Sequence, residues 1–146
     1  YLKKGKKLDI QLILEAKPLP TKEMEDQAIA NIVKMVKKMG LENQVEYISF
    51  SLNMCEQLAK LTPASEIAYL NGDIAPAELK KKGINGIDYH YNVIEKHPEW
   101  VKEAHDLGMK VNVWTVNKED MMKKLIDRKV DYITTDQPLE LKKLLE

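Results

Sequence analysis

The sequence predicts an α/β fold, a partial TIM (βα)8-type barrel with six parallel strand–helix units. Short apolar runs alternate with longer amphipathic runs, and the ends of the apolar runs lie about 20 to 33 residues apart, a usual pitch for such a unit. Strands separated by helices run parallel, because a hairpin cannot join them. An open doubly wound sheet gives the same alternation. The lack of a glycine-rich loop after the first strand favours the barrel.

The elements follow in order from these runs. We expect the first strand over residues 8–17, ended by Pro18, and a helix from Thr21 that ends at Gly40. The apolar residues of that helix recur at helical spacing: Ala28, Ile29, Ile32, Val33, Val36 and Met39. Further strands are expected over 45–50, 65–70, 86–91, 111–116 and 130–135, and further helices over 53–61, 76–82, 98–107, 118–129 and 139–145.

A complete barrel of this kind has eight units and about 250 residues. Residues 1–146 therefore form a single domain that is three-quarters of a barrel, with two open edges and an uncovered inner face. Either polypeptide outside this sequence or a second copy of the chain would complete it. Because Tyr1 is not a natural first residue, we expect that upstream residues have been removed.

Composition excludes several classes of function. Lys plus Arg and Asp plus Glu number 23 each, so no net charge favours nucleic acid or an anionic membrane. We interpret the cluster Lys3, Lys4, Lys6 and Lys7 as a solvated turn. There is no apolar run of about 18 residues and no visible signal peptide. The compartment stays open, with bacterial cytoplasm and periplasm both compatible.

Cys55 is the single cysteine, so an internal disulfide is excluded. It lies in a helical pattern with Leu52, Leu58 and Ala59, which favours a small buried residue over a nucleophile.

The candidate site lies where barrel enzymes place it, at the carboxyl ends of the strands. Glu15 and Lys17 point to the same inward face as Ile13. Two inward charges are costly unless they meet a metal, a partner or a ligand. The alternative is a surface ion pair, which requires an edge strand with an exposed end.

Other polar or aromatic residues also follow strands: Asn71, His90, Trp114, Asn117 and Asp136. Asp136 is equally compatible with capping the next helix, Trp114 with the core, and His90 with packing. The pair His105-Asp106 lies within a helix, and His97 begins that helix, so neither is expected to act in catalysis.

Four stretches carry a resemblance to a known family: residues 14–17 (LEAK), 48–50 (ISF), 113–117 (VWTVN) and 130–138 (VDYITTDQP). Their order and spacing resemble the later part of the glycerophosphodiester phosphodiesterase family. Trp-Thr-Val-Asn followed about 20 residues later by Thr-Asp-x-Pro is the most specific element.

The resemblance implies a barrel hydrolase that converts glycerophosphodiesters to an alcohol and glycerol 3-phosphate with a divalent cation, Mg²⁺ or Ca²⁺. It implies that Glu15 binds the metal, that Lys17 binds the substrate phosphate, and that Phe50 and Trp114 line the substrate cleft. Hard oxygen ligands suit either cation, and a lysine near the cation stabilises charge on the phosphoryl group.

The sequence departs from the family at its start. The His-Arg-Gly strand and the Glu-x-Asp strand do not occur here, which agrees with six units out of eight. The His-Asp step that follows them in the family has no counterpart either, because His105-Asp106 lies in a late helix. No catalytic residue is therefore assigned in this chain, and the chain alone is expected to be inactive. Two alternatives are a noncatalytic arc that self-associates through its edges, and an aldolase-like barrel with Lys17 as Schiff-base lysine.

Overall fold

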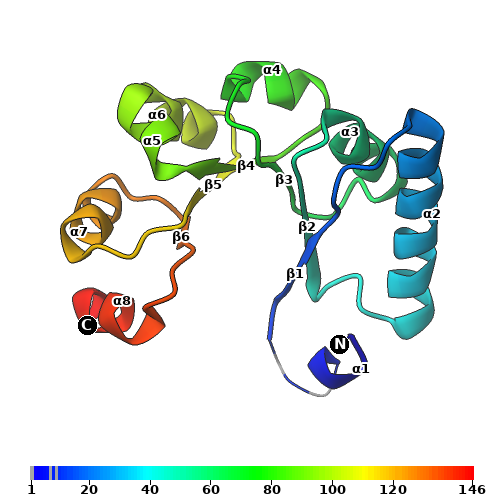
Figure 1. Cartoon of the computed structure of the whole chain (residues 1–146), viewed down its shortest axis with the longest axis horizontal. Coiled ribbons are helices and arrows are strands. Elements are labelled where there is room, and N and C mark those ends of the chain that lie inside the picture. Colours follow the sequence, from blue (N-terminus) through cyan, green and yellow to red (C-terminus); the bar gives the residue numbers. More distant parts are fainter. Residues whose placement is uncertain (1, 7, 9) are drawn as a thin grey trace.

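Six parallel strands form one curved sheet with the helices along its outer side (Figure 1). The structure is a computed structural model and describes residues 2–6, 8 and 10–146. The strands are β1 (Leu12–Glu15), β2 (Val45–Ser49), β3 (Ile67–Tyr69), β4 (Gly86–His90), β5 (Lys110–Trp114) and β6 (Tyr132–Ile133). Their order in the sheet is their order in the sequence. A doubly wound sheet would break that order, so the prediction of a barrel is confirmed.

The helices connect successive strands. They are α1 (Leu2–Gly5), α2 (Lys22–Met39), α3 (Leu52–Leu61), α4 (Pro76–Lys81), α5 (Tyr91–Lys96), α6 (Glu99–Asp106), α7 (Glu119–Asp127) and α8 (Pro138–Leu145). Within the described part of the chain, no helix has the length and apolar character needed to cross a bilayer.

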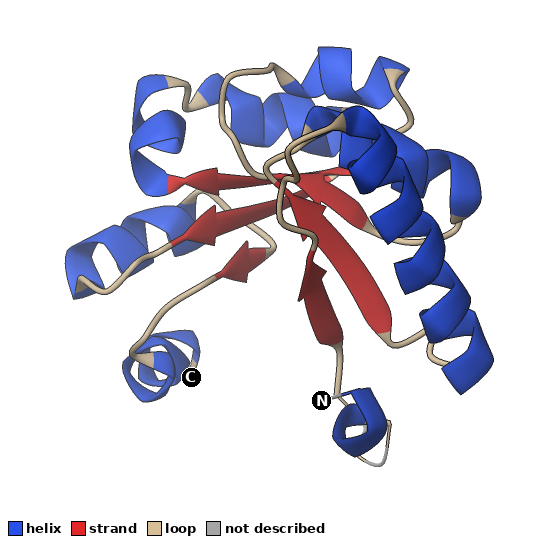
Figure 2. Ribbon diagram, turned by 45° about the vertical axis from the view of Figure 1, so that its right-hand side comes forward, coloured by secondary structure: helices blue, strands red, loops and turns tan. Residues whose placement is uncertain are grey.

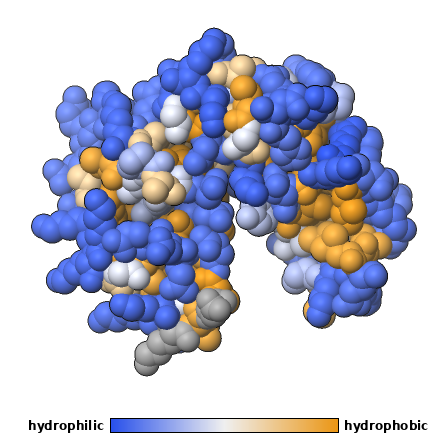
Figure 3. All heavy atoms as spheres, turned by 180° about the vertical axis from the view of Figure 1, so that it is seen from behind, coloured by the Kyte–Doolittle hydropathy of each residue, from blue (hydrophilic) through white to orange (hydrophobic). Residues whose placement is uncertain are grey.

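The arc is open, as the six-unit count predicts. Among the described residues, β1 pairs only with β2 and β6 only with β5. The strands lie inside the arc of helices (Figure 2). The two arms, ending near α1 and α8, leave a hollow between them (Figures 1 and 3). The sheet is therefore a partial TIM barrel whose inner face is uncovered.

Local sequence explains the best-formed helix, α2. The Thr21 hydroxyl accepts a hydrogen bond from the Met24 amide at 3.2 Å and caps the first turn. Gly40 ends the helix in the left-handed conformation with φ of 63°, which suits a residue without a side chain. The buried stripe Ile29, Val33 and Val36 packs on the sheet. The predicted span from Thr21 to Gly40 is confirmed.

Alternation along each strand divides the sheet into two faces. The side chains that point outward join the helices in one core: Leu12, Val45, Tyr47, Ile67, Tyr69, Ile87, Tyr89, Val111 and Val113. The inner face carries Ile13, Ile48, Ala68, Asp88, Asn112 and Thr134, which line a cavity. The core therefore lies between the sheet and the helices, and the polar residues of the strands face the hollow.

The differences from prediction are local. The first strand begins at Leu12 rather than at residue 8, and Asp9 lies outside the described residues. β3 and β6 are shorter than predicted. The short helix α5 begins directly after β4, where no helix was expected, because no glycine or proline separates the two elements.

Two compositional predictions have different outcomes. Cys55 is fully buried, and burial raises the pKa of its thiol to about 12, so the prediction of an unreactive core residue is confirmed. The solvated turn expected around the lysine cluster is wrong for Lys3 and Lys4, which are exposed but lie in α1. Lys6 donates to the Met39 carbonyl, and Lys7 lies outside the described residues.

The contribution of the outer core is testable on α3. Leu58 is fully buried, whereas Leu61 on the same helix is 44% exposed. We expect Leu58→Ala to lower the free energy of unfolding by about 2 to 5 kcal/mol, because it leaves a cavity. Leu61→Ala should change it by about 0.5 kcal/mol or less. Urea denaturation measures both, and equal effects would contradict the assignment of the core.

Candidate active site

Glu15 and Lys17 meet at the open edge of the arc. The Lys17 ammonium lies 2.8 Å from Glu15 Oε1, and the two side chains are 78% and 34% exposed. Glu15 ends the edge strand β1, so both charges stand at the rim of the hollow. In the described arc the pair is thus the surface ion pair that the sequence left as an alternative. Its exposure leaves both groups accessible to a ligand.

An aromatic cluster forms another part of the rim. The rings of Phe50 and Trp114 meet edge to face with centroids 5.8 Å apart, and His90 meets Trp114 in the same way at 5.1 Å. These residues follow or end β2, β5 and β4. The Trp114 indole N–H donates to the Asp88 carbonyl at 2.8 Å, which fixes the indole over the sheet. The structure therefore brings together two residues that the sequence proposed for one cleft.

Asp88 lies on the inner face of β4, one strand repeat below His90. It is 2% exposed, and Oδ1 has no hydrogen-bond partner among the described residues. Burial raises the pKa of the Asp88 carboxyl to about 7; the nearby Asn112 amide acts in the opposite direction, and the negative charge of Glu15 raises it further. Asp88 and Glu15 are thus close enough to interact electrostatically.

A cavity of about 230 Å³ runs along this inner face. Asp88, Asn112 and Thr134 line its polar part, and Asn112 donates to the Thr134 hydroxyl at 3.2 Å. Ile13 and Ile48 supply apolar wall. At the amino end of the strands the lining includes three charged residues, Glu46, Glu66 and Lys110.

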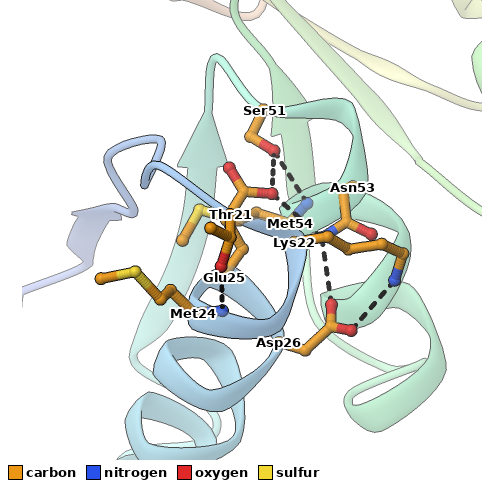
Figure 4. Close-up of polar contacts among 8 residues, drawn as sticks. All are labelled: Thr21, Lys22, Met24, Glu25, Asp26, Ser51, Asn53 and Met54. Atoms are coloured by element: carbon orange, nitrogen blue, oxygen red, sulfur yellow. Dashed lines mark hydrogen bonds and ion pairs between the residues drawn. The ribbon is translucent and has the colours of Figure 1, made fainter.

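A buried carboxylate on α2 holds the loops behind the rim (Figure 4). Glu25 is 7% exposed and accepts hydrogen bonds from the Ser51 hydroxyl at 2.8 Å, the Asn53 amide at 3.0 Å and the Leu19 backbone N–H at 3.3 Å. Asn53 also donates to Asp26. Glu25 therefore ties the loop after Lys17 to the start of α3, beside Phe50.

The other candidates bind neighbouring protein groups. The Asn117 amide donates to Asp136 Oδ2 at 2.8 Å, and the Asp136 backbone N–H donates to Asn117 Oδ1 at 2.9 Å. Asp136 is not the cap of α8, whose N-cap residue is Gln137. His90 accepts from the Asn92 N–H at 3.2 Å and so caps α5. Asn71 is exposed in the loop after β3.

The two remaining histidines lie away from the rim. His105 pairs with Asp131 at 2.9 Å, ahead of β6, and not with Asp106. His97 stacks on Trp100 with ring centroids 4.2 Å apart. Within the described part of the chain, neither histidine contacts Glu15, Lys17 or the aromatic cluster.

The donor atoms fit only part of a cation site. Glu15 offers the hard oxygen that Mg²⁺ and Ca²⁺ prefer. No group of three His, Cys, Asp or Glu side chains that could hold a metal ion occurs within residues 2–6, 8 and 10–146. The described arc can therefore contribute a ligand to a cation but does not enclose one.

Sequence reasoning missed Asp88 and Glu25. A signal for Asp88 was present, because it shares the inward face of β4 with His90 and an aspartate inside a strand is unusual. Glu25 gave none, since its partners come from distant parts of the chain.

The fold and rim define a class: a parallel barrel with its candidate site at the carboxyl ends of the strands. The sequence model of the glycerophosphoryl diester phosphodiesterase family matches residues 3–140. The chain belongs to this family.

Individual relatives support this family assignment. A glycerophosphodiester phosphodiesterase from Caldanaerobacter subterraneus subsp. tengcongensis is 28% identical over 111 residues, which are 73% of this chain and 44% of the relative. The crystal structure of a glycerophosphodiester phosphodiesterase from Parabacteroides distasonis is 48% identical with a TM-score of 0.97, covering 99% of this chain and 61% of that chain.

A more distant likeness concerns the fold alone. A phosphodiesterase from Oleispira antarctica, solved in complex with the product sn-glycerol-3-phosphate, is 19% identical with a TM-score of 0.73, covering 92% of this chain and 55% of that chain. The chain thus spans less than two thirds of the length of each of these relatives.

The Asp88 carboxyl makes stability depend on pH. Its pKa is about 7 in the folded state against 3.8 ordinarily, so between these values the folded state holds a proton that the unfolded state has lost. The free energy of unfolding should therefore fall as pH rises through this window, by up to about 4 kcal/mol. Asp88→Asn should remove this component in urea denaturation from pH 4 to pH 8. Glu23→Gln, at an exposed site, should keep it; an unaltered profile in Asp88→Asn would contradict the argument.

We expect the hydrogen bonds of Glu25 to stabilise the folded state and to order the segments that they join. Glu25→Ala removes three hydrogen bonds to a buried carboxylate, and we expect a loss of about 2 to 3 kcal/mol in the free energy of unfolding. The Leu19 amide should also exchange its hydrogen faster. Glu23→Ala changes an exposed residue in the same helical turn and serves as control. Indistinguishable denaturation and exchange of the two variants would refute the role of Glu25.

Proposed function

We propose that the protein containing this chain hydrolyses glycerophosphodiesters to an alcohol and sn-glycerol 3-phosphate. The observation that carries the proposal is the contact of Phe50 with Trp114 at the strand ends that also bear Glu15 and Lys17. Family membership supports the reaction class. The similar barrel from Oleispira antarctica, solved with sn-glycerol-3-phosphate, supports the product.

Each rim residue would have a distinct role. The Lys17 ammonium, 78% exposed, would leave Glu15 and pair with the phosphate oxygens. Glu15 would provide one ligand to a divalent cation, Mg²⁺ or Ca²⁺, with the remaining ligands from outside this chain. Such a cation neutralises charge on the phosphoryl group when bound. Phe50 and Trp114 would pack against the carbon atoms of the substrate and exclude water.

Proton transfer would depend on groups that this chain does not supply. His90 caps α5, His97 stacks on Trp100, and His105 pairs with Asp131. We therefore propose that the chain alone is inactive. The strands that close the barrel against β1 and β6 would belong to further polypeptide rather than to a second copy, since the Parabacteroides distasonis relative is longer than the part matched here.

Hydrolysis of glycerophosphocholine in the presence of Mg²⁺ or Ca²⁺ tests the proposal. The readout is the amount of sn-glycerol 3-phosphate that is released. The longest natural polypeptide that contains this chain should turn over, and the 146-residue chain should not. Glu15→Gln and Lys17→Met should each lower kcat/KM by about 100-fold or more, because both remove stabilisation of phosphoryl charge.

Glu46→Gln is the matched control, because Glu46 lies on the inner face near the amino end of β2. It should retain activity. Turnover by the 146-residue chain that disappears in Glu15→Ala would disprove the proposed inactivity. Full activity of Glu15→Gln in the longer protein would refute the proposed site.

A further inference from the structure

A buried hydroxyl joins two segments of the rim. Ser49 ends β2 and is fully buried on the outward face of the sheet. Its hydroxyl donates a hydrogen bond to the Ala16 carbonyl at 2.6 Å and accepts one from the Ser51 backbone N–H at 3.0 Å. Ala16 directly precedes Lys17, and Ser51 directly follows Phe50. The hydroxyl therefore fixes the distance between the backbone beside Lys17 and the backbone beside Phe50.

Glu25 makes a second connection between the same two segments (Figure 4). Its carboxylate accepts hydrogen bonds from the Leu19 backbone N–H at 3.3 Å and from the Ser51 hydroxyl at 2.8 Å. Leu19 lies two residues after Lys17. One connection fixes a distance, whereas two connections between the same segments also restrict their relative rotation. Glu25 and Ser49 together thus form a hydrogen-bond clamp.

The clamp lies outside the part of the arc that further strands would cover. Ser49 faces the helices, and Glu25 lies in the first turn of α2 and is 7% exposed. Strands that close the barrel would pair with the free edges of β1 and β6 and face the hollow. The hydrogen bonds of the clamp are therefore complete within the described arc.

The two rim side chains depend on the backbone beneath them. Lys17 is 78% exposed and Phe50 is 37% exposed, so packing alone does not fix either side chain. Productive binding requires reacting groups to be placed closely, and an error of about 1 Å can lower the rate by about 100-fold. Restraint of the backbone on both sides of the cleft is a direct means to this accuracy.

We propose that Glu25 and Ser49 are positioning residues of the hydrolase. They hold the segment that bears Lys17 at a fixed separation from the segment that bears Phe50, and this separation sets the width of the cleft between the phosphate-binding lysine and the apolar wall. The inference rests on the proposed function and deepens it. Both residues act through Lys17 and Phe50 rather than by contact with the substrate.

Kinetics of combined variants test the clamp. In the longest natural polypeptide that contains this chain, Glu25→Ala should lower kcat/KM for glycerophosphocholine by roughly 10-fold, because Lys17 is displaced. Glu25→Gln keeps one acceptor oxygen and should lose less. In the Lys17→Met background, Glu25→Ala should cost only about 2-fold, since residues that act through one another are not additive. Ser49→Ala should show the same pattern as Glu25→Ala.

Leu79 provides the control for a loss of stability alone, because it is fully buried on α4. Leu79→Ala should destabilise the fold by leaving a cavity but keep kcat/KM within about 2-fold at a temperature at which every variant is folded. Full activity of Glu25→Ala would overturn the proposal. A loss from Glu25→Ala that is equally large with and without Lys17→Met would also overturn it.

A spectroscopic readout separates this inference from the proposed function. The rings of Trp114 and Phe50 meet edge to face, so the surroundings of Trp114 report the position of Phe50. In fluorine NMR of protein that contains fluorotryptophan, the Trp114 resonance is assigned by its loss in Trp114→Phe. It should shift or broaden in Glu25→Ala and Ser49→Ala but not in Leu79→Ala. Absence of turnover in the unmutated protein would refute the proposed function, while an unchanged resonance in both clamp variants would overturn the clamp.

Discussion

The parallel ladder between successive strands is the constraint on which the rest of this structure depends. Each parallel connection crosses over through a helix with the same hand, so all the helices are placed on one side of the sheet. The outward strand residues, such as Tyr47 and Tyr89, are buried there. The inner face receives no helix, and polar residues such as Asp88 and Asn112 can occupy it without disturbing the core.

The same constraint collects the candidate site at one rim. Parallel strands end on the same side, so Glu15 on β1 and Trp114 on β5 share a rim although they are distant in the sequence. The exact positions of the side chains and loops at the rim then depend on hydrogen bonds between distant parts of the chain. The Trp114 indole is held by the Asp88 carbonyl, and the loops near Lys17 and Phe50 are joined through Glu25. Flexible loops thereby acquire fixed positions relative to a rigid sheet.

The sequence predicts the elements well where local signals are strong. Thr21 and Gly40 mark the ends of α2, and the Trp-Thr-Val-Asn stretch places Trp114 at a strand end, as found. Elements whose ends are not marked by a glycine, a proline or a capping residue were less predictable. α5 follows β4 directly, and β6 retains only Tyr132–Ile133 of its predicted length. Strand length depends on pairing partners, which the sequence pattern does not contain.

The site was predictable only in part, for the same reason. Alternation placed Glu15 and Lys17 on one face, but their ion pair and their exposure depend on β1 being an edge strand. The meeting of Phe50 with Trp114 followed from the family resemblance. The Glu25 network joins three separate segments through side-chain geometry, and no periodic pattern encodes such contacts.

Asp88 carries a cost in stability within the described arc. A buried carboxyl with an unpaired oxygen weakens the folded state, and an apolar residue would fit the inner face at lower cost. Within the described arc, no hydrogen bond to Oδ1 offsets that cost. Groups that break a local rule without a structural benefit concentrate at functional sites. The charged pair at the rim, Glu15 and Lys17, is the part of the described arc that we propose recognises an anion.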